Sequence, residues 1–205
     1  MKSNAAPIKS FHHGNLRQAL VEAALALPDI ESLSLRQLAT EIGVSPAAVY
    51  RHFSNREDLL LEVSRIGFDR LAVRFSEAFS LSTPPATQRE AKRRLLRLAC
   101  AYFAFADEET ALWTLMFGSQ SVQYRANPET GMRANTYEHL AAALHGLRVT
   151  GVIQRQPDRN DHLFAWGAIH GVATLRCGQV KSALVPRAKL AAEMSRRVIR
   201  ALRVV

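Results

Sequence analysis

The sequence has little of what disulfide-stabilised, metal-binding or membrane-spanning proteins need. Its 205 residues include only two cysteines, Cys100 and Cys177, which lie far apart and form no CxxC pair or other metal-ligand spacing. Isolated cysteines suit a reducing compartment. The apolar runs end well short of the ~18 residues that a membrane span needs, and residues 1–15 show no apolar core of a signal peptide. We therefore expect a cytoplasmic protein without a membrane partner.

The motifs of common enzyme classes are also missing. The chain has no HExxH, no GxSxG, no phosphate-binding loop and no dinucleotide fingerprint. Its seven histidines are scattered without ligand spacing, apart from the neighbours His12 and His13. We therefore expect no catalytic residue, no cofactor and no metal ion.

Glycine and proline are scarce, and no segment alternates polar and apolar residues as a strand does. Apolar residues instead recur at helical spacing between caps and breaks, which predicts an all-α fold of about nine helices. The clearest break is residues 80–86, SLSTPPA. We divide the chain into an N-terminal domain at 1–55, a connecting helix at 56–80 and a second helical domain at 81–205. The predicted helices are 16–27, 56–79, 87–106, 107–117, 128–147, 159–178 and 186–205, together with two short helices between 34 and 53.

Residues 34–60, SLRQLATEIGVSPAAVYRHFSNREDLL, predict two short helices around a tight turn, followed directly by a third. Gly43 stands where the first helix must stop, because glycine tolerates the left-handed conformation of a C-cap. Ser45 is an N-cap, and Pro46 suits a first helical turn. This arrangement is typical of a helix-turn-helix, which presents one helix to the major groove of DNA. Capping boxes are predicted for Ser34 with Gln37, Ser54 with Glu57, and Thr87 with Glu90.

Acidic residues are absent from 1–20 and from 45–56, and this local absence favours DNA binding over a plain three-helix core. The net charge of +9 is weaker evidence for that segment. Residues 1–75 contribute only +1 of it, whereas residues 76–205 contribute +8. Such a basic surface adds affinity for any nucleic acid through counterion release.

At this point the chain resembles the tetracycline-repressor-like (TetR) family of bacterial transcription regulators. The resemblance rests on HHGNL at 12–16, SLRQLATEIGVSPAAVYRHF at 34–53 and NREDLL at 55–60, in register. The second half is similar to the subgroup named for a Trp-His-Gly motif, through Trp166, His170-Gly171 and WTLMF at 113–117. Arg56 departs from the family's more usual lysine but still offers a phosphate contact.

The resemblance implies a homodimer that places two recognition helices in successive major grooves of a palindromic operator, ~34–36 Å apart. It also implies a cavity for a small-molecule effector whose binding releases the DNA, as a repressor requires. The candidate DNA-binding residues are Ser34, Arg36, Ser45, Pro46, Ala47, Ala48, Tyr50, Arg51, His52 and Arg56. The candidate effector-binding residues are Tyr102, Phe103, Trp113, Met116, Phe117, Trp166 and His170. The candidate dimer contacts are Val172, Leu175, Leu190, Met194, Val198 and Leu202.

Within the first set, Arg51 is the candidate for reading guanine, and the small side chains at 46–48 lie nearest the base edges. Tyr50, His52 and Arg56 are assigned to phosphates. An arm with Lys9, His12, His13 and Asn15 either reaches the DNA or is a disordered tail. The aromatic residues of the second set also suit a plain core, and His170 suits a satisfied core histidine.

Three other hypotheses stay open at this stage. One is an enzyme, against which the missing motifs count. Another is a protein that coats DNA without sequence preference, whose affinity would fall steeply with salt. The last keeps the operator but replaces the effector by oxidation of Cys100 or Cys177.

Overall fold

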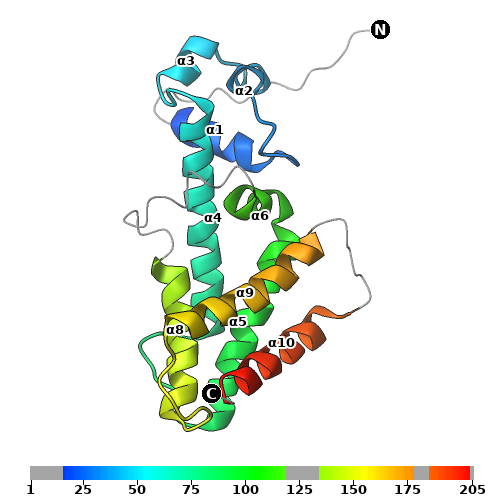
Figure 1. The fold of residues 1–205 in the computed structure, drawn as a ribbon. Helices are drawn as coiled ribbons and strands as arrows, with labels where there is room; N and C mark the ends of the chain where they lie inside the picture. The colour runs from blue at the N-terminus through cyan, green and yellow to red at the C-terminus, as the bar shows by residue number, and fades with distance from the viewer. Residues whose placement is uncertain (1–15, 119–133, 178–184, 204–205) are drawn as a thin grey trace.

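One long helix runs from the N-terminal helices into the rest of the molecule (Figure 1). The computed structural model describes residues 16–118, 134–177 and 185–203. Within these ranges every regular element is helical, which confirms the all-α prediction. The helices are α1 (Leu16–Leu25), α2 (Leu35–Ile42), α3 (Pro46–Tyr50), α4 (Arg56–Ala78), α5 (Gln88–Glu108), α6 (Thr110–Phe117), α8 (Ala134–Val149), α9 (Arg159–Cys177) and α10 (Arg187–Ala201).

Helices α1 to α3, which we call the reading head, pack around the first turns of α4 (Figure 1). Leu20 of α1, Leu38 of α2 and Val49 of α3 are fully or almost fully buried. Phe53, in the loop before α4, and Leu60, in the first turns of α4, belong to the same core. These are apolar positions at helical spacing, so one small core holds three short helices that could not persist alone. The position of α3 is therefore fixed by this shared core.

The helix caps of this region follow the sequence only in part. Gly43 adopts φ 75°, ψ 33° and ends α2, as predicted. The side chain of Ser45 accepts a hydrogen bond from the Ala48 N–H at 3.2 Å, as predicted. Ser34 occupies the N-cap position of α2 but its side chain makes no cap hydrogen bond, so the predicted box with Gln37 is wrong.

The predicted cap of α4 is displaced by one residue. Asn55, rather than Ser54, is the N-cap, and its side chain accepts from the Asp58 N–H at 2.8 Å. Both residue types are good N-caps, so composition alone does not choose between them. The third predicted cap is correct, because Thr87 Oγ1 accepts from the Glu90 N–H at 3.2 Å.

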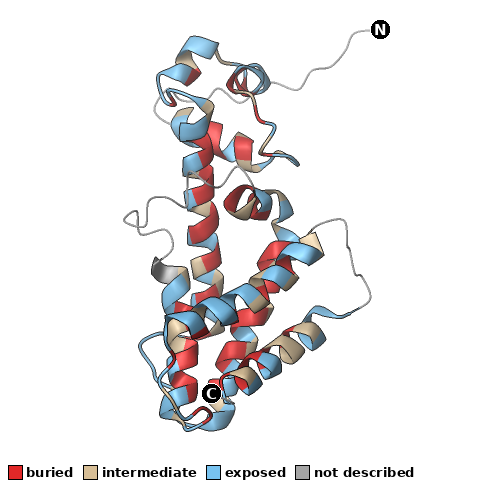
Figure 2. Cartoon of the chain, viewed as in Figure 1, coloured by how far each residue is buried: buried red, intermediate tan, exposed pale blue. Residues whose placement is uncertain are grey.

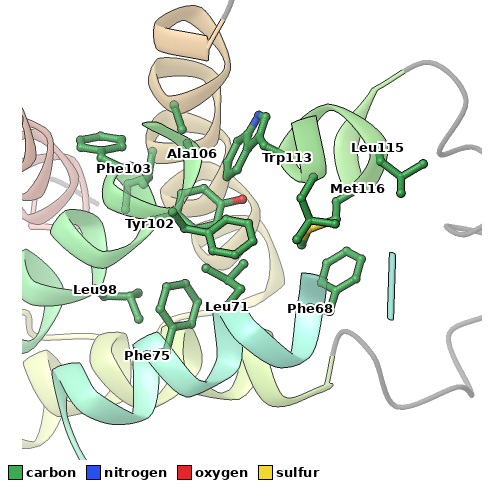
Figure 3. Packing of buried hydrophobic residues seen from close by; sticks show 14 of the residues in the cluster. Phe68, Leu71, Phe75, Leu98, Tyr102, Phe103, Ala106, Trp113, Leu115 and Met116 are labelled. Atoms are coloured by element: carbon green, nitrogen blue, oxygen red, sulfur yellow. The ribbon is translucent and has the colours of Figure 1, made fainter. Parts of the chain in front are cut away.

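Beyond the head, α5 lies at the centre and contacts α4, α6, α8, α9 and α10. Buried residues line the facing sides of these helices and form a core continuous with that of the head (Figure 2). Figure 3 shows Phe68, Leu71 and Phe75 of α4 pointing towards Tyr102 of α5 and Met116 of α6. The predicted break at 80–86 falls between the end of α4 and the start of α5. The division into domains itself stays a prediction.

One glycine allows α6 to approach α4 closely. A Cβ added at Gly67 would collide with Met116 Sδ and come within 3.0 Å of Leu112 Cγ. Since α6 packs on α4 at this point, glycine is required for the contact rather than for a special backbone conformation. The start of the helix predicted at 128–147 lies outside the described residues, and α8 is described from Ala134.

Candidate DNA-binding face and effector region

The recognition helix α3 is short and almost entirely exposed. Val49 is its only buried residue and anchors the helix to the head core. Pro46, Ala47 and Tyr50 are exposed, and Ala48 is partly exposed. With small side chains in the first turn, the backbone of α3 can come close to a flat partner such as the edges of base pairs.

Arg51 and His52 follow α3 directly and are exposed, so both predicted residues lie beside the small side chains. The remaining candidates from the preceding helix lie close in sequence to its start: Ser34 is half-buried and Arg36 is exposed. The predicted residues at the start of α2 and on α3 are thus all at least partly exposed. The arm residues Lys9, His12, His13 and Asn15 lie outside the described residues.

Sequence reasoning missed Arg17, which holds the end of the recognition segment. Its Nη1 donates to the His52 carbonyl oxygen at 3.1 Å, and its guanidinium lies 4.5 Å from the centre of the Phe53 ring. Its Nη2 also lies 3.5 Å from the Glu62 carboxylate on α4. Arg17 therefore joins α1, the α3 segment and α4. The acid-free run around it gave only a general signal for DNA contact.

The guanidinium of Arg56 binds backbone groups within the protein. Its Nε donates to the Leu33 carbonyl oxygen at 2.8 Å, and its Nη2 donates to the Glu31 carbonyl oxygen. These carbonyls belong to the corner between α1 and α2, so Arg56 fastens that corner to the first turn of α4. The geometry favours a positioning role for Arg56 over the predicted phosphate contact, and nothing in the local sequence signals it.

The predicted effector residues form a continuous aromatic group around His170. The His170 ring stacks on Trp113 and on Trp166, with centroids 5.3 and 4.8 Å apart. Phe117 meets the same ring edge-on at 4.8 Å, and Tyr102 lies against Trp113 at 4.9 Å. We call Tyr102, Trp113, Phe117, Trp166 and His170 the aromatic cluster. It joins α5, α6 and α9 and contains five of the seven candidate effector-binding residues, whose role in binding stays a prediction.

A chain of hydrogen bonds runs through this cluster. The Tyr102 hydroxyl and His170 Nδ1 are 2.9 Å apart, and Trp166 Nε1 donates to the same hydroxyl at 3.3 Å. Thr174 Oγ1 lies 3.4 Å from His170 Nε2. Burial raises the pKa of Tyr102, so the hydroxyl stays protonated and available as a donor. Both ring nitrogens of His170 have a polar neighbour, as a satisfied core histidine does.

The other two predicted effector residues, Phe103 and Met116, are buried in the core. A separate groove of about 610 Å³ lies between α4 and α8. Sequence reasoning did not identify this groove, because its lining comes from helices that are far apart in the chain. The lining residues are Asp69, Ala72, Val73, Ser76, Glu77, Leu81 and His139.

The predicted dimer contacts differ in their exposure. Leu175 is 61% exposed, and Val172, Leu190 and Met194 are partly exposed. Val198 and Leu202, however, are buried within the protomer by the packing of α10, so they are not available to a partner. The amphipathic pattern of α10 was correct, but it did not tell which apolar residues face α5.

Helix α9 also exposes apolar residues that sequence reasoning missed. Leu163 and Phe164 are 60% and 48% exposed. Gly167 and Gly171 are exposed on the same side of the helix, and an added Cβ at either would meet nothing within 4 Å. Apolar side chains and glycines at i, i+4 spacing on a face that should be polar were the signal that could have revealed this surface.

Comparison with known proteins agrees with this arrangement. Residues 20–63 match the family model described as bacterial regulatory proteins, tetR family, and residues 95–202 match the model described as a tetracyclin repressor-like C-terminal domain. The chain therefore belongs to the TetR family of bacterial regulatory proteins, and it is a DNA-binding transcriptional regulator rather than an enzyme. The finer assignment to the subgroup with the Trp-His-Gly motif stays a prediction.

Individual relatives show the same family. The HTH-type transcriptional regulator BetI of Rhizobium meliloti (strain 1021) is 30% identical over 165 residues, which cover 69% of this chain and 80% of that protein. A Rhodococcus sp. RHA1 protein of unknown function has a similar structure, with a TM-score of 0.73, 28% identity and coverage of 95% and 99% of the two chains. PfmR of Thermus thermophilus, a TetR family transcriptional regulator, shares the fold with a TM-score of 0.64, 21% identity and coverage of 89% and 97%.

Members of this family bind DNA operators and act as dimers. Among the helices that the structure describes, none combines the length and apolar character of a membrane span.

Proposed function

We propose that the protein is a homodimeric repressor that reads an inverted-repeat operator with α3 and releases it when a small molecule binds the C-terminal region. The observation that carries the proposal is the form of α3. The helix is capped by Ser45, is anchored by Val49 alone and has its other side chains at least partly exposed. Such a helix is built to be docked against a partner rather than to fill a core.

The contacts are assigned from exposure and chemistry. Pro46, Ala47 and Ala48 approach the base edges, where alanine methyls meet thymine methyls. Arg51 reads a guanine through its two-pronged guanidinium. Tyr50, His52, Ser34 and Arg36 contact phosphates and set the position of α3. Arg56 is left out of this set because its guanidinium already binds two backbone carbonyls.

The proposed dimer uses the exposed apolar face of α9 together with α10. Phe164, Gly167, Gly171 and Leu175 lie along one side of α9. The two glycines would let a second α9 approach closely, with the larger side chains packing beside them. Leu190 and Met194 of α10 extend the apolar area.

The proposed effector site is the aromatic cluster. It combines flat apolar rings with the hydroxyl of Tyr102 and the ring nitrogens of His170, a combination typical of small-molecule sites. A ligand that uses these polar atoms would replace the hydrogen bonds that they now make to one another and to Thr174. Because the cluster joins α6 and α9 through Trp113 and His170, a ligand that separates these two rings would move elements that lie between the head and the dimer face. This arrangement supports a linkage between effector and DNA.

The decisive experiment is selection of bound duplexes from a randomised DNA library by the purified full-length protein at near-physiological salt. One inverted repeat with half-sites about one helical turn apart is the expected result. Recovery of duplexes without any common sequence would refute operator reading. A single half-site without a repeat would refute the dimeric arrangement and leave the assignment of α3 intact.

A further inference from the structure

The net positive charge of the chain is concentrated far from the recognition helix. Residues 88–97 and 187–203 contain eleven Lys and Arg against two acids, Glu90 and Glu193. Their net charge of +9 equals that of the whole chain, so the remaining residues are neutral in sum. Twenty-seven residues on two helices therefore account for a feature that DNA reading by α3 does not explain.

The cations form stripes along the exposed sides of two helices that pack together. Arg89, Arg93 and Arg97 follow one another at i, i+4 spacing on α5 and are all exposed. Arg196 and Arg197 on α10 have side-chain exposures of 73% and 70%, and Arg200 is exposed one turn later. The spacing of four residues on α5 puts a positive charge about every 6 Å along that helix, whereas the cations of α10 are spaced less evenly, with none between Lys189 and Arg196.

Most of this charge is not neutralised inside the protein. Glu90 pairs with Arg94 at 2.7 Å, and Glu193 pairs with Arg196 and Arg197 at 2.6 and 2.7 Å. Six cations of the two stripes make no ion pair with any described residue. They are Arg89, Lys92, Arg93, Arg97, Lys189 and Arg200. We call this set the distal basic face.

The ends of the two stripes meet at the turn after α8. Gln88 Nε2 donates to the Gly151 carbonyl oxygen at 3.4 Å, and Arg203 Nε donates to the Val152 carbonyl oxygen at 2.9 Å. The start of α5 and the end of α10 therefore lie side by side, at the end of the molecule opposite α3 (Figure 1). Arg89, Lys92, Arg93 and Arg200 thus lie towards the end opposite the reading head. Lys189 extends the set along α10 towards the other end of α5, where the neighbouring Arg187 pairs with Glu108.

This placement has a cost in stability. Arg89 lies in the first turn of α5, where the positive end of the helix dipole disfavours a cation, and Lys92 and Arg93 follow in the second turn. Their mutual repulsion adds to that cost. A folding role does not account for cations in these positions, whereas an anionic partner would turn both costs into binding energy.

The chemistry of the face fits phosphate groups of duplex DNA. Four of the six cations of the distal basic face are arginine, whose guanidinium donates two parallel hydrogen bonds to a phosphate. None of the exposed large apolar side chains lies on either segment, so the face lacks the residues that would insert into a lipid surface. The evenly spaced cations of α5 suit a rigid partner with regularly spaced negative charges, such as a DNA duplex.

We propose that the distal basic face binds a second DNA duplex without sequence preference, so that a protein bound through α3 also holds a neighbouring DNA segment. The second contact uses phosphates only, and it weakens with salt as counterions are released less favourably. It raises the local concentration of DNA around the protein without altering which sequence α3 prefers.

The test separates the two ends in the full-length protein. Ala47→Glu places a negative charge on the exposed face of α3 and disables the head. In this background we compare Arg89→Glu/Arg93→Glu with the charge-conserving Arg89→Lys/Arg93→Lys. Fluorescence anisotropy of a ~30-base-pair random duplex, titrated over a range of salt concentrations, gives the affinity and the salt slope. Arg159→Glu, an exposed cation on α9, is the control for a charge reversal elsewhere.

We expect the Ala47→Glu protein still to bind the duplex. The glutamate pair then loses about tenfold or more in affinity and flattens the salt slope by about 2, whereas the lysine pair and Arg159→Glu change little. In a second assay, the protein with an intact α3 is bound to an immobilised operator and captures a labelled random duplex. The glutamate pair abolishes this capture, whereas Arg159→Glu does not. Circular dichroism confirms that the exposed substitutions leave the helices formed.

Equal binding by the glutamate pair and its parent would overturn the proposal. So would binding of the parent to phosphatidylserine vesicles in preference to DNA, with the glutamate pair losing the vesicles alone. Failure of the proposed operator reading would appear in a separate measurement. The native protein, whose α3 is intact, would then select no common sequence from a randomised DNA library.

Discussion

The two ends of the molecule present opposite kinds of surface. At one end α3 exposes small and aromatic side chains, and residues 1–75 carry a net charge of only +1. At the other end the distal basic face carries charge almost without apolar side chains. Base edges are distinguished by shape and hydrogen bonds, whereas phosphates are held by charge. A high net charge therefore need not lie where the sequence of DNA is read.

A substitution that prevents dimerisation should affect the two ends of the molecule most differently. Leu175→Glu places a charge on the exposed apolar face of α9, where a partner would have to desolvate it. We expect sedimentation to shift to the monomer and operator affinity to fall by ~10² or more, because two linked heads bind far more tightly than one. Binding of random duplex through the distal basic face should change little.

Val73→Glu on α4 is the matched control, since Val73 is exposed to a similar extent, 57%, and belongs to another helix. An unchanged dimer in Leu175→Glu, or an equal loss in both variants, would place the interface elsewhere.

A smaller effect is expected where the head is held together. Arg56→Ala removes two hydrogen bonds from a guanidinium to the Leu33 and Glu31 carbonyls. Bonds to charged groups contribute more than neutral ones, so we expect a loss of about 2–3 kcal/mol in the free energy of unfolding. Chemical denaturation measures it, with Arg36→Ala as an exposed control on α2.

The same variant decides whether Arg56 belongs to the DNA surface. Unaltered stability together with a salt slope flattened by ~1 would return Arg56 to the phosphate contacts. Loss of stability with an unaltered slope is the outcome that the hydrogen bonds predict.

A single substitution can distinguish base recognition by α3 from non-specific binding of phosphates by a positive charge. Arg51→Ala should reduce operator affinity by ~1–3 kcal/mol and relax the preference at one base position, because a guanidinium is lost from the groove. Arg93→Ala on α5 removes the same charge at the other end and should leave base preference intact. Comparison of the two selected DNA libraries makes the measurement. Uniform weakening of all sequences by Arg51→Ala would make it a phosphate contact.

Much of the head was predictable because its signals are local. Gly43, Ser45 and Pro46 each act within one helical turn, and the structure places them as expected. Where two neighbouring residues compete, as Ser54 and Asn55 do, the exit direction of α4 decides and the sequence does not show it. Arg56 and Arg17 bind groups 23 to 35 positions away, so no local pattern reveals their partners.

The C-terminal region was predictable as helices but not as surfaces. The aromatic cluster followed from residue type and the family resemblance, and its members do meet around His170. The α4–α8 groove and the exposed side of α9 depend instead on which face each helix turns towards its neighbours. Helical periodicity fixes that a face exists, whereas packing of distant segments decides which one is covered.

The smallest effect is expected at the cysteines, where the alternative of an oxidation signal is tested. Cys177 Sγ donates to the Ala106 carbonyl oxygen at 3.0 Å, and burial, assisted by the nearby Asp107 carboxylate, raises the pKa of the thiol to about 11. Burial also raises the pKa of Cys100. Both thiols therefore stay protonated at neutral pH, and alkylation of Cys177 should accelerate about tenfold for each unit of pH until about 11.

Cys100→Ser and Cys177→Ser should accordingly leave operator binding and effector release unchanged. In the native protein, iodoacetamide at pH 7 should alkylate both thiols much more slowly than it alkylates glutathione. Rapid alkylation of the native protein, or release of the operator by mild peroxide that either serine variant prevents, would contradict the effector hypothesis in favour of oxidation. The geometry opposes that outcome, because the thiolate is the nucleophile and the surroundings of Cys177 disfavour it. A signal received in this region is then more readily transmitted by displacement of the aromatic rings than by a covalent change at sulfur.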